Sequence, residues 1–321
     1  MLEVEAEAQL AHAQQRALAI ADNVEKVILG KRREVELAVA ALLCRGHVLI
    51  EDRPGTGKTM LGRALARSIS GEFHRIQFTP DLLPSDITGV TIYDQARLEF
   101  RFHAGPIFAN IVLADEINRA TPKAQSSLLE CMDEYQVTVD GKTHALDLPF
   151  FVIATENPIE YHGTYPLPEA QLDRFLLRIE LGYPSAATEI AMLNAQERSH
   201  PIHALEPVIG GEEVCALQDR VCLLPVSDVV KDYIVRLVSL SRDHRFVTMG
   251  ASPRGSLALM RMAQCWALMH GLSAPREDEV KEVAPAILAH RLILSPEARA
   301  GGLDARGVVE QMLLETEVIV P

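Results

Sequence analysis

The sequence predicts an α/β domain built on a largely parallel five-stranded sheet with helices on both faces, followed by a smaller all-helical domain. In the first part of the chain, short apolar runs typical of buried parallel strands alternate with amphipathic helical stretches. After Pro184 the strand signals stop and helical periodicities continue. A length of 321 residues is ample for two domains. We therefore expect an αβα core over residues 1–184 and a helical domain over residues 185–321.

The core is expected to open with two helices, because apolar residues recur at helical spacing over residues 5–28 and 34–44. The five predicted strands cover residues 48–50, 74–79, 111–114, 150–154 and 178–181. The helices between them are predicted at residues 58–69, 121–134 and 169–177.

Two further stretches of the core are typical of β-hairpins. Residues 97–103 alternate polar and apolar side chains and follow a predicted loop over residues 80–89. Val137 and Val139 also alternate, and the Asp140-Gly141 pair after them suits a two-residue turn. In the helical domain, the predicted helices cover residues 186–199, 212–221, 228–244, 253–270, 276–290 and 304–317.

Residues 47–60, which read HVLIEDRPGTGKTM, predict a nucleotide site. An apolar strand, a glycine-rich loop and a helix follow one another, which is the context of a phosphate-binding loop. Gly55 and Gly57 let backbone N–H groups approach phosphate oxygens, and Lys58 brings a positive charge to the β- and γ-phosphates. Thr59 places a hydroxyl where Mg²⁺ would bind. The predicted nucleotide-binding residues of this loop are Pro54, Gly55, Thr56, Gly57, Lys58, Thr59 and Met60.

Asp115 and Glu116 end a fully apolar strand and predict the hydrolytic half of the site. Hydrolysis needs a placed metal ion and an activated water as well as a bound nucleotide. Asp115 would hold Mg²⁺ together with Thr59, because this hard cation prefers oxygen ligands. Glu116, one residue on, would polarise the attacking water.

Three further side chains are candidates for contact with the phosphates. Asn157 ends the next strand and could orient the water without adding charge. Arg174 could stabilise charge on the transferring phosphoryl group, although a surface salt bridge with Asp173 or Glu169 would also explain it. Arg254 falls in the first turn of a predicted helix, where a cation opposes the helix dipole. This placement favours phosphate contact over a tolerated surface arginine.

The amino-acid composition argues against several classes of protein. The formal net charge of −13, from 31 basic and 44 acidic residues, argues against a general grip on nucleic acid. The five cysteines show no CxxC pair or zinc-like spacing and are expected to be buried thiols in a reducing compartment. No apolar run reaches membrane-spanning length, and the N-terminal segment lacks the layout of a signal peptide. We expect a cytoplasmic protein without a membrane span.

With these residues identified, nearly the whole chain resembles a MoxR-type AAA+ ATPase. Asp52 stands where the usual phosphate-binding loop begins with glycine, and this substitution is common in that family. The stretches that carry the resemblance are VILGK (27–31), LIEDRPGTGKT (49–59), FHRIQFTPDLLPSDITG (73–89), ADEINRA (114–120), ATENPIEYHGTYPLPEAQLDRF (154–175) and GASPR (250–254).

The resemblance implies roles for several residues. Gly30 and Lys31 would line the adenine pocket, and Asn157 would occupy the sensor 1 position. Arg174 would be an arginine finger acting on a neighbouring subunit. Arg254 would be sensor 2, in cis or in trans. ATP hydrolysis with Mg²⁺, a homo-oligomeric ring (a hexamer) and a helical lid are the properties that the resemblance implies.

The resemblance also implies a function in remodelling or activating partner proteins. Such proteins are similar to chelatase motor subunits, which act in metal-cofactor insertion, and their partners often carry von Willebrand factor A-type domains. A nucleic-acid motor of the helicase or clamp-loader type is the alternative, and it would need basic hairpins. The hairpin stretch over residues 97–103 does carry Arg97, Arg101 and His103, but the hairpin over residues 137–148 has one lysine against two aspartates. The balance favours a protein substrate. A nucleotide-gated scaffold with little turnover would need a damaged catalytic residue.

Overall fold

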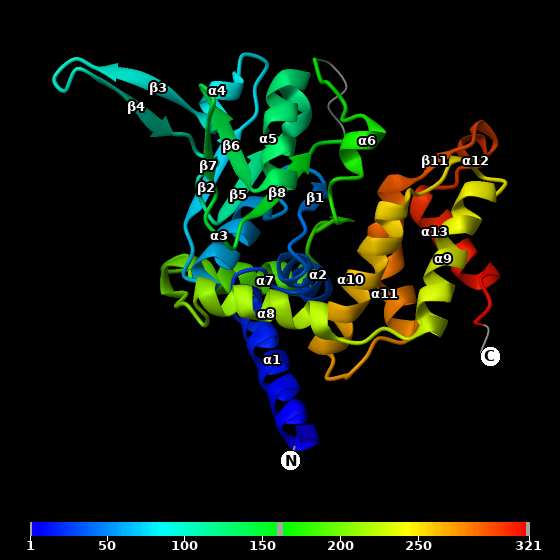
Figure 1. Cartoon of the computed structure of the whole chain (residues 1–321). Coiled ribbons are helices and arrows are strands. Elements are labelled where there is room, and N and C mark those ends of the chain that lie inside the picture. Colours follow the sequence, from blue (N-terminus) through cyan, green and yellow to red (C-terminus); the bar gives the residue numbers. More distant parts are fainter. Residues whose placement is uncertain (1, 159–162, 319–321) are drawn as a thin grey trace.

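The fold is described by a computed structural model of residues 2–158 and 163–318. Its core is a parallel five-stranded sheet in the order β2-β5-β8-β1-β9, and a helical domain lies beside it (Figure 1). All five predicted strands are present, so the predicted fold class is confirmed. The strands in sheet order are β2 (Phe73–Gln77), β5 (Ile111–Asp115), β8 (Phe151–Glu156), β1 (Val48–Glu51) and β9 (Leu177–Ile179).

The apolar runs form strands because both faces of the sheet are buried. On β5, Ile111 and Leu113 belong to one hydrophobic core, which they share with α1, α2 and α3. Val112 and Ala114 point to the opposite face and belong to a second core with α5. Alternate residues of one strand thus enter two different cores, which is why the run is continuously apolar. The helices of the core are α1 (Leu2–Glu25), α2 (Arg32–Leu43), α3 (Lys58–Ser68), α4 (Pro84–Thr88), η1 (Ile117–Arg119), α5 (Pro122–Glu134) and α6 (Glu169–Leu172).

The core carries two β-hairpins. The hairpin with the Asp140-Gly141 turn is confirmed as β6 (Gln136–Val139) and β7 (Lys142–Ala145), and both turn residues have positive φ. The strand predicted at 97–103 is β4 (Glu99–Ala104). Its partner β3 (Gly89–Asp94) was missed, and α4 occupies part of the predicted loop. Together β3 and β4 extend away from the sheet (Figure 1).

Gly89 shows why the entry to this hairpin needs glycine. Its φ is +94°, and a Cβ placed there would lie 2.3 Å from the carbonyl oxygen of His103 on the opposite strand. A larger residue would therefore separate the first pair of the hairpin. The sequence alone showed this glycine as a loop signal, because only the paired strand reveals the close approach.

The chain after residue 184 contains the six predicted helices, with ends shifted by a few residues. It also contains features that the sequence did not reveal, because they are too short to show periodicity. These are a two-stranded antiparallel sheet and the five-residue helix α12. The elements of this part are α7 (Ala186–Gln196), η2 (Pro201–Ala204), α8 (Gly211–Leu223), α9 (Asp228–Asp243), β10 (Val247–Met249), α10 (Pro253–Met269), α11 (Glu277–Leu288), η3 (Ala289–Arg291), β11 (Ile293–Leu294), α12 (Pro296–Ala300) and α13 (Ala305–Glu315).

Arg291 joins the helical domain to the core. Its side chain is 3% exposed and donates to Asp173 Oδ1 at 2.8 Å and to the carbonyl oxygens of Phe175 and Leu176 at 2.6 and 3.1 Å. The Ser252 hydroxyl, at the start of α10, also donates to Asp173 Oδ2 at 2.7 Å. One carboxylate therefore fixes two elements of the helical domain to the segment that precedes β9.

The cysteine prediction was wrong in part. Cys131 and Cys265 are buried, but Cys44 and Cys215 are partly exposed and Cys222 is exposed. All five are free thiols in the structure. Among the residues described, no helix is long and apolar enough to cross a membrane.

Candidate functional site

The phosphate-binding loop connects β1 to α3. Gly55 and Gly57 both adopt positive φ, +82° and +99°, and Gly57 is the left-handed residue from which α3 begins. This backbone bends over the N-terminus of the helix, where free N–H groups and the helix dipole favour an anion. Lys58 Nζ donates to the carbonyl oxygens of Asp52 and Glu156, the latter at 3.3 Å. Burial lowers the pKa of Lys58, while the neighbouring carboxylates, first among them Asp52, oppose that effect.

A cavity of about 390 Å³ lies in front of this loop. It brings together residues from β1–α3, from the ends of β5 and β8, and from β2. Arg75 is the lining residue that the sequence interpretation missed. The cavity is lined by Pro54, Gly55, Gly57, Lys58, Thr59, Met60, Arg75, Asp115, Glu116 and Asn157.

Asp115 is held by three hydrogen bonds at the end of β5. Thr155 of β8 donates its hydroxyl to Asp115 Oδ1 at 2.7 Å. Arg75 of β2 donates twice to Oδ2, from Nε at 2.9 Å and from Nη2 at 2.6 Å. Because β2 and β8 flank β5 in the sheet, both partners reach the carboxylate from neighbouring strands. Its orientation is fixed before any ligand arrives.

Glu116 follows β5 in a left-handed conformation, with φ of +57°. Its backbone N–H donates to Thr155 Oγ1 at 2.8 Å. Its Oε2 accepts from Gln77 Nε2 at 2.7 Å and from Arg119 Nη1 at 3.0 Å. The two carboxylates line one cavity but have different side-chain partners, so they can serve different functions there.

The donor set fits a magnesium–nucleotide complex. Thr59 supplies a hydroxyl oxygen and Asp115 a carboxylate, which are ligands that Mg²⁺ prefers. Lys58 donates to backbone carbonyls, so its positive charge can still serve a phosphate. Asn157 is buried, follows β8 directly and lines the same cavity, as expected for a residue near the terminal phosphate.

A second carboxylate pair lies beside the cavity. The sheet register places Glu51 of β1 next to Glu156 of β8, and Arg178 Nη1 contacts Glu51 Oε2 at 2.6 Å. Burial, helped by the charge of Glu51, raises the pKa of Glu156 to about 7. Both glutamates follow apolar strands in the sequence, but their pairing depends on the strand order.

Gly30 and Lys31 lie outside the lining of the cavity. Gly30 has φ of +69° and packs against Thr188 of α7, and Lys31 Nζ donates to the carbonyl oxygen of Tyr183 at 3.3 Å. Ile28 lies close to Gly57, which brings this segment next to the phosphate loop. Thr56 is also absent from the lining residues, and its hydroxyl donates to the carbonyl oxygen of Arg53 at 3.2 Å.

Arg174 and Arg254 meet on a different surface. Arg174 donates to the carbonyl oxygen of Leu129 at 2.8 Å and lies 3.4 Å from Asp133 Oδ2. Arg254 Nη2 lies 3.9 Å from the same oxygen. The salt-bridge partner of Arg174 in the structure is therefore Asp133, and not Asp173 or Glu169 as the sequence suggested. Ser252 caps α10, accepting from the backbone N–H of Arg254 at 3.1 Å. Neither arginine lines the cavity in front of the phosphate loop.

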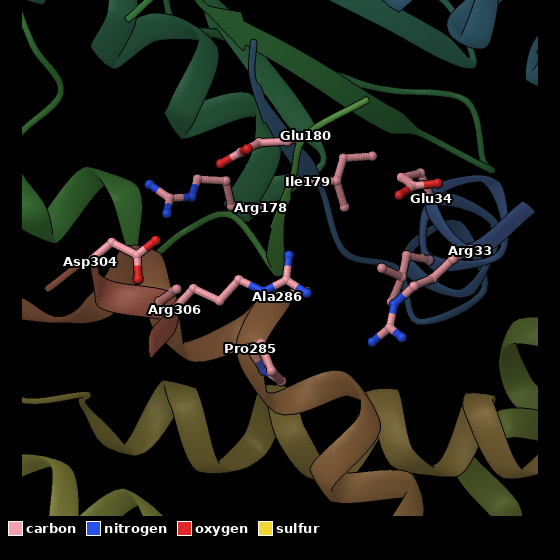
Figure 2. Close-up of a pocket in the computed structure, with 11 residues that line it drawn as sticks. Arg33, Glu34, Arg178, Ile179, Glu180, Pro285, Ala286, Asp304 and Arg306 are labelled. Carbon is pink, nitrogen blue, oxygen red and sulfur yellow. The ribbon is translucent and has the colours of Figure 1, made fainter. Parts of the chain in front are cut away.

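Another cavity, of about 320 Å³, lies between the core and the helical domain (Figure 2). Arg33, Arg178 and Arg306 line it together with three carboxylates. Arg33 also contacts Glu282 at 2.5 Å, and Arg306 contacts Glu310 at 3.3 Å. Balanced and paired charges do not suit a polyphosphate, so this cavity is not a competing nucleotide site. Its remaining side chains are Glu34, Leu37, Ile179, Glu180, Pro285, Ala286, Ala289 and Asp304.

The chain matches known proteins over most of its length. Residues 47–177 match the family described as "ATPase family associated with various cellular activities (AAA)", and residues 239–312 match the AAA lid domain. The chain is 53% identical to YeaC of Bacillus subtilis over 93% of each sequence. It is 41% identical to Chaperone MoxR1 of Mycobacterium tuberculosis, over 91% of this chain and 79% of that protein. A crystal structure of a putative ATPase from Cytophaga hutchinsonii superposes with a TM-score of 0.92 at 36% identity, covering both chains fully.

Proposed function

Because the chain belongs to the MoxR-type AAA+ ATPases, we propose that it binds ATP with Mg²⁺ in front of the phosphate loop and hydrolyses it to ADP and phosphate. The observation that supports this best is the convergence of Lys58, Thr59, Asp115, Glu116 and Asn157 on one cavity. These residues come from three strand ends, and each supplies a group that phosphoryl transfer to water requires.

The chemistry would be divided among the residues by position. The N–H groups of the loop and Lys58 would hold the β- and γ-phosphates. Thr59 and Asp115 would hold Mg²⁺, which neutralises charge on the phosphate oxygens. Glu116 would accept a proton from the attacking water as the new P–O bond forms and the bond to the ADP oxygen breaks. Asn157 would orient that water.

Arg174 and Arg254 would act on a neighbouring subunit. Both lie outside the cavity of their own chain and share Asp133 as a partner. An arginine that stabilises the transition state only when a neighbour docks makes hydrolysis depend on assembly. We propose a homo-oligomeric ring, a hexamer, in which these arginines complete the adjacent site. Gly30 and Lys31, beside the phosphate loop, would contact the adenine.

A protein client fits the exposed surface of the β3–β4 hairpin better than a nucleic acid does. Leu98 and Phe100 are 75% and 73% exposed, and the ring of Phe100 contacts that of Tyr93 at 5.1 Å between centroids. Exposed apolar side chains of this kind typically mark contacts with protein. We propose chaperone-like remodelling of a partner protein in the cytoplasm, with von Willebrand factor A-domain proteins and metal-cofactor insertion as the candidate settings.

The decisive experiment measures ATP turnover and ATP binding in wild type and Glu116→Gln. The variant is expected to bind ATP with unchanged affinity and to lose turnover, because the amide accepts no proton from water. Equal turnover in the two proteins would overturn the assignment of Glu116 as the base.

The ring is tested by turnover as a function of protein concentration, with Arg174→Ala and the exposed Arg306→Ala as a matched control. Wild type and the control are expected to show specific activity that rises with concentration, and Arg174→Ala to stay low throughout. A specific activity that does not vary with concentration and is unchanged in Arg174→Ala would refute a finger in trans.

A further inference from the structure

Arg75 makes an unusual contact with the carboxylate that would hold the metal. It projects from β2 toward the end of β5, and its Nε and Nη2 both donate to Asp115 Oδ2, at 2.9 and 2.6 Å. The other oxygen of Asp115 accepts from Thr155 at 2.7 Å. Both carboxylate oxygens are therefore engaged, one of them by a cation.

A guanidinium and a divalent cation compete for this position. A metal ion at Asp115 Oδ2 would lie within a few ångströms of the Arg75 guanidinium, and two cations so close repel each other strongly in a partly buried site. Asp115 is 15% exposed, so solvent screens this repulsion only in part. Either the arginine moves or the metal binds weakly.

Arg75 has room to move. Its side chain is 48% exposed and lines the cavity in front of the phosphate loop. Its contacts are with Asp115 and, through Nη2, with Gln77 Oε1 at 2.6 Å. A nucleotide in the cavity would bring phosphate charge that could receive the displaced guanidinium.

We propose that Arg75 is a positioning residue that occupies the metal-binding face of Asp115 and is displaced when Mg²⁺ enters with the nucleotide. The arginine neutralises a carboxylate that would otherwise bind free divalent cations. It therefore makes metal binding depend on the nucleotide, whose phosphates both hold the ion and attract the arginine. This inference rests on the proposed function in assigning Asp115 to the metal.

Mn²⁺ is a suitable probe because binding removes its free-ion EPR signal, and no nucleotide or turnover is needed. In nucleotide-free protein, wild type is expected to bind Mn²⁺ weakly. Arg75→Met, which removes the charge but keeps the length of the side chain, is expected to bind it about tenfold more tightly, as loss of one charge-assisted contact implies. Arg63→Met, at an exposed arginine of α3, is the matched control and is expected to behave as wild type.

A second substitution tests whether the tighter Mn²⁺ binding of Arg75→Met occurs at Asp115. Adding Asp115→Asn to Arg75→Met is expected to return Mn²⁺ affinity to the wild-type value. Arg75→Lys, which keeps the charge but cannot donate twice in a fork, is expected to give an intermediate affinity and provides the test if the methionine variant does not fold. Equal Mn²⁺ affinity in wild type and both Arg75 variants, or a gain that survives Asp115→Asn, would overturn the proposal.

The proposed hydrolysis and the proposed competition between Arg75 and the metal can be refuted independently of each other. If Glu116→Gln retained full turnover, the hydrolytic mechanism would fall, while the competition at Asp115 would still be measured directly by Mn²⁺. If Mn²⁺ affinity did not respond to Arg75, hydrolysis could still proceed as proposed, with the arginine as a fixed support of Asp115.

Discussion

The hydroxyl of Thr155 forms hydrogen bonds with both acidic residues of the site, Asp115 and Glu116. It donates to Asp115 Oδ1 at 2.7 Å and accepts from the backbone N–H of Glu116 at 2.8 Å. Thr155 is 1% exposed, so both bonds are at least partly shielded from water. A single side chain on β8 thus sets the geometry of two consecutive residues after β5.

Thr155→Val keeps the shape of the side chain and removes both bonds. The partly buried backbone N–H of Glu116 then loses its acceptor, which should cost about 1–3 kcal/mol of unfolding free energy. ATP turnover should fall as well, because both carboxylates lose their support. Urea denaturation and steady-state ATPase assays measure the two effects. Thr155→Ser keeps the hydroxyl and should retain most of the stability and most of the ATP turnover. A valine variant as stable and active as wild type would contradict this account.

Lys58→Met should weaken ATP binding without destabilising the fold. Its ammonium is half-buried and contacts backbone carbonyls, so its removal should leave the melting temperature unchanged or slightly higher. Binding of ATP should weaken about a hundredfold through the loss of a charge-assisted contact to phosphate. Calorimetric titration with ATP checks the second effect. A variant that binds ATP normally would show that Lys58 does not reach the phosphates.

Glu156 should make the stability of the protein depend on pH. Its pKa rises from 4.5 in the unfolded chain to about 7 in the fold, so the folded state holds the proton more tightly. Stability from this group is fully present below pH 4.5 and is lost as pH rises to about 7, by up to about 3 kcal/mol. Glu156→Gln should remove this loss, so its melting temperature should exceed that of wild type more at pH 8 than at pH 5. Parallel pH profiles for Glu156→Gln and wild type would disprove the assignment.

Arg291→Met should be strongly destabilising. The substitution leaves Asp173 without its buried cation and several carbonyl oxygens without a donor, a loss of about 3–5 kcal/mol. Adding Asp173→Asn should recover part of that loss, because the unpaired charge is then gone. Chemical denaturation of the single and double variants gives both values. A cost below about 1 kcal/mol for the single variant would mean that the helical domain is attached mainly by apolar packing.

The sequence determined the strands and the phosphate loop because these depend on local pattern. The continuous apolar run of β5 reflects burial on both faces, and Gly55 and Gly57 supply the positive φ that the loop adopts. That Asp115 and Asn157 line one cavity could be predicted because each directly follows or ends a buried strand. The carboxyl ends of parallel strands meet at one edge of the sheet, so order along the chain was sufficient to place them together.

Only the tertiary structure decided which side chains surround those residues. Arg75 and Gln77 lie on β2, 40 and 39 positions before Asp115 and Glu116, and become their partners because β2 pairs with β5. The pairing of Glu51 with Glu156 likewise depends on β1 lying next to β8.

Arg174 and Arg254 were proposed from the sequence one at a time, yet their meeting at Asp133 depends on the start of α10 lying near the end of α5. Local pattern specifies where a strand ends and which group it presents there. The neighbours of that group depend on strand order and domain packing, which no local pattern contains, and they are the contacts that set its charge and orientation.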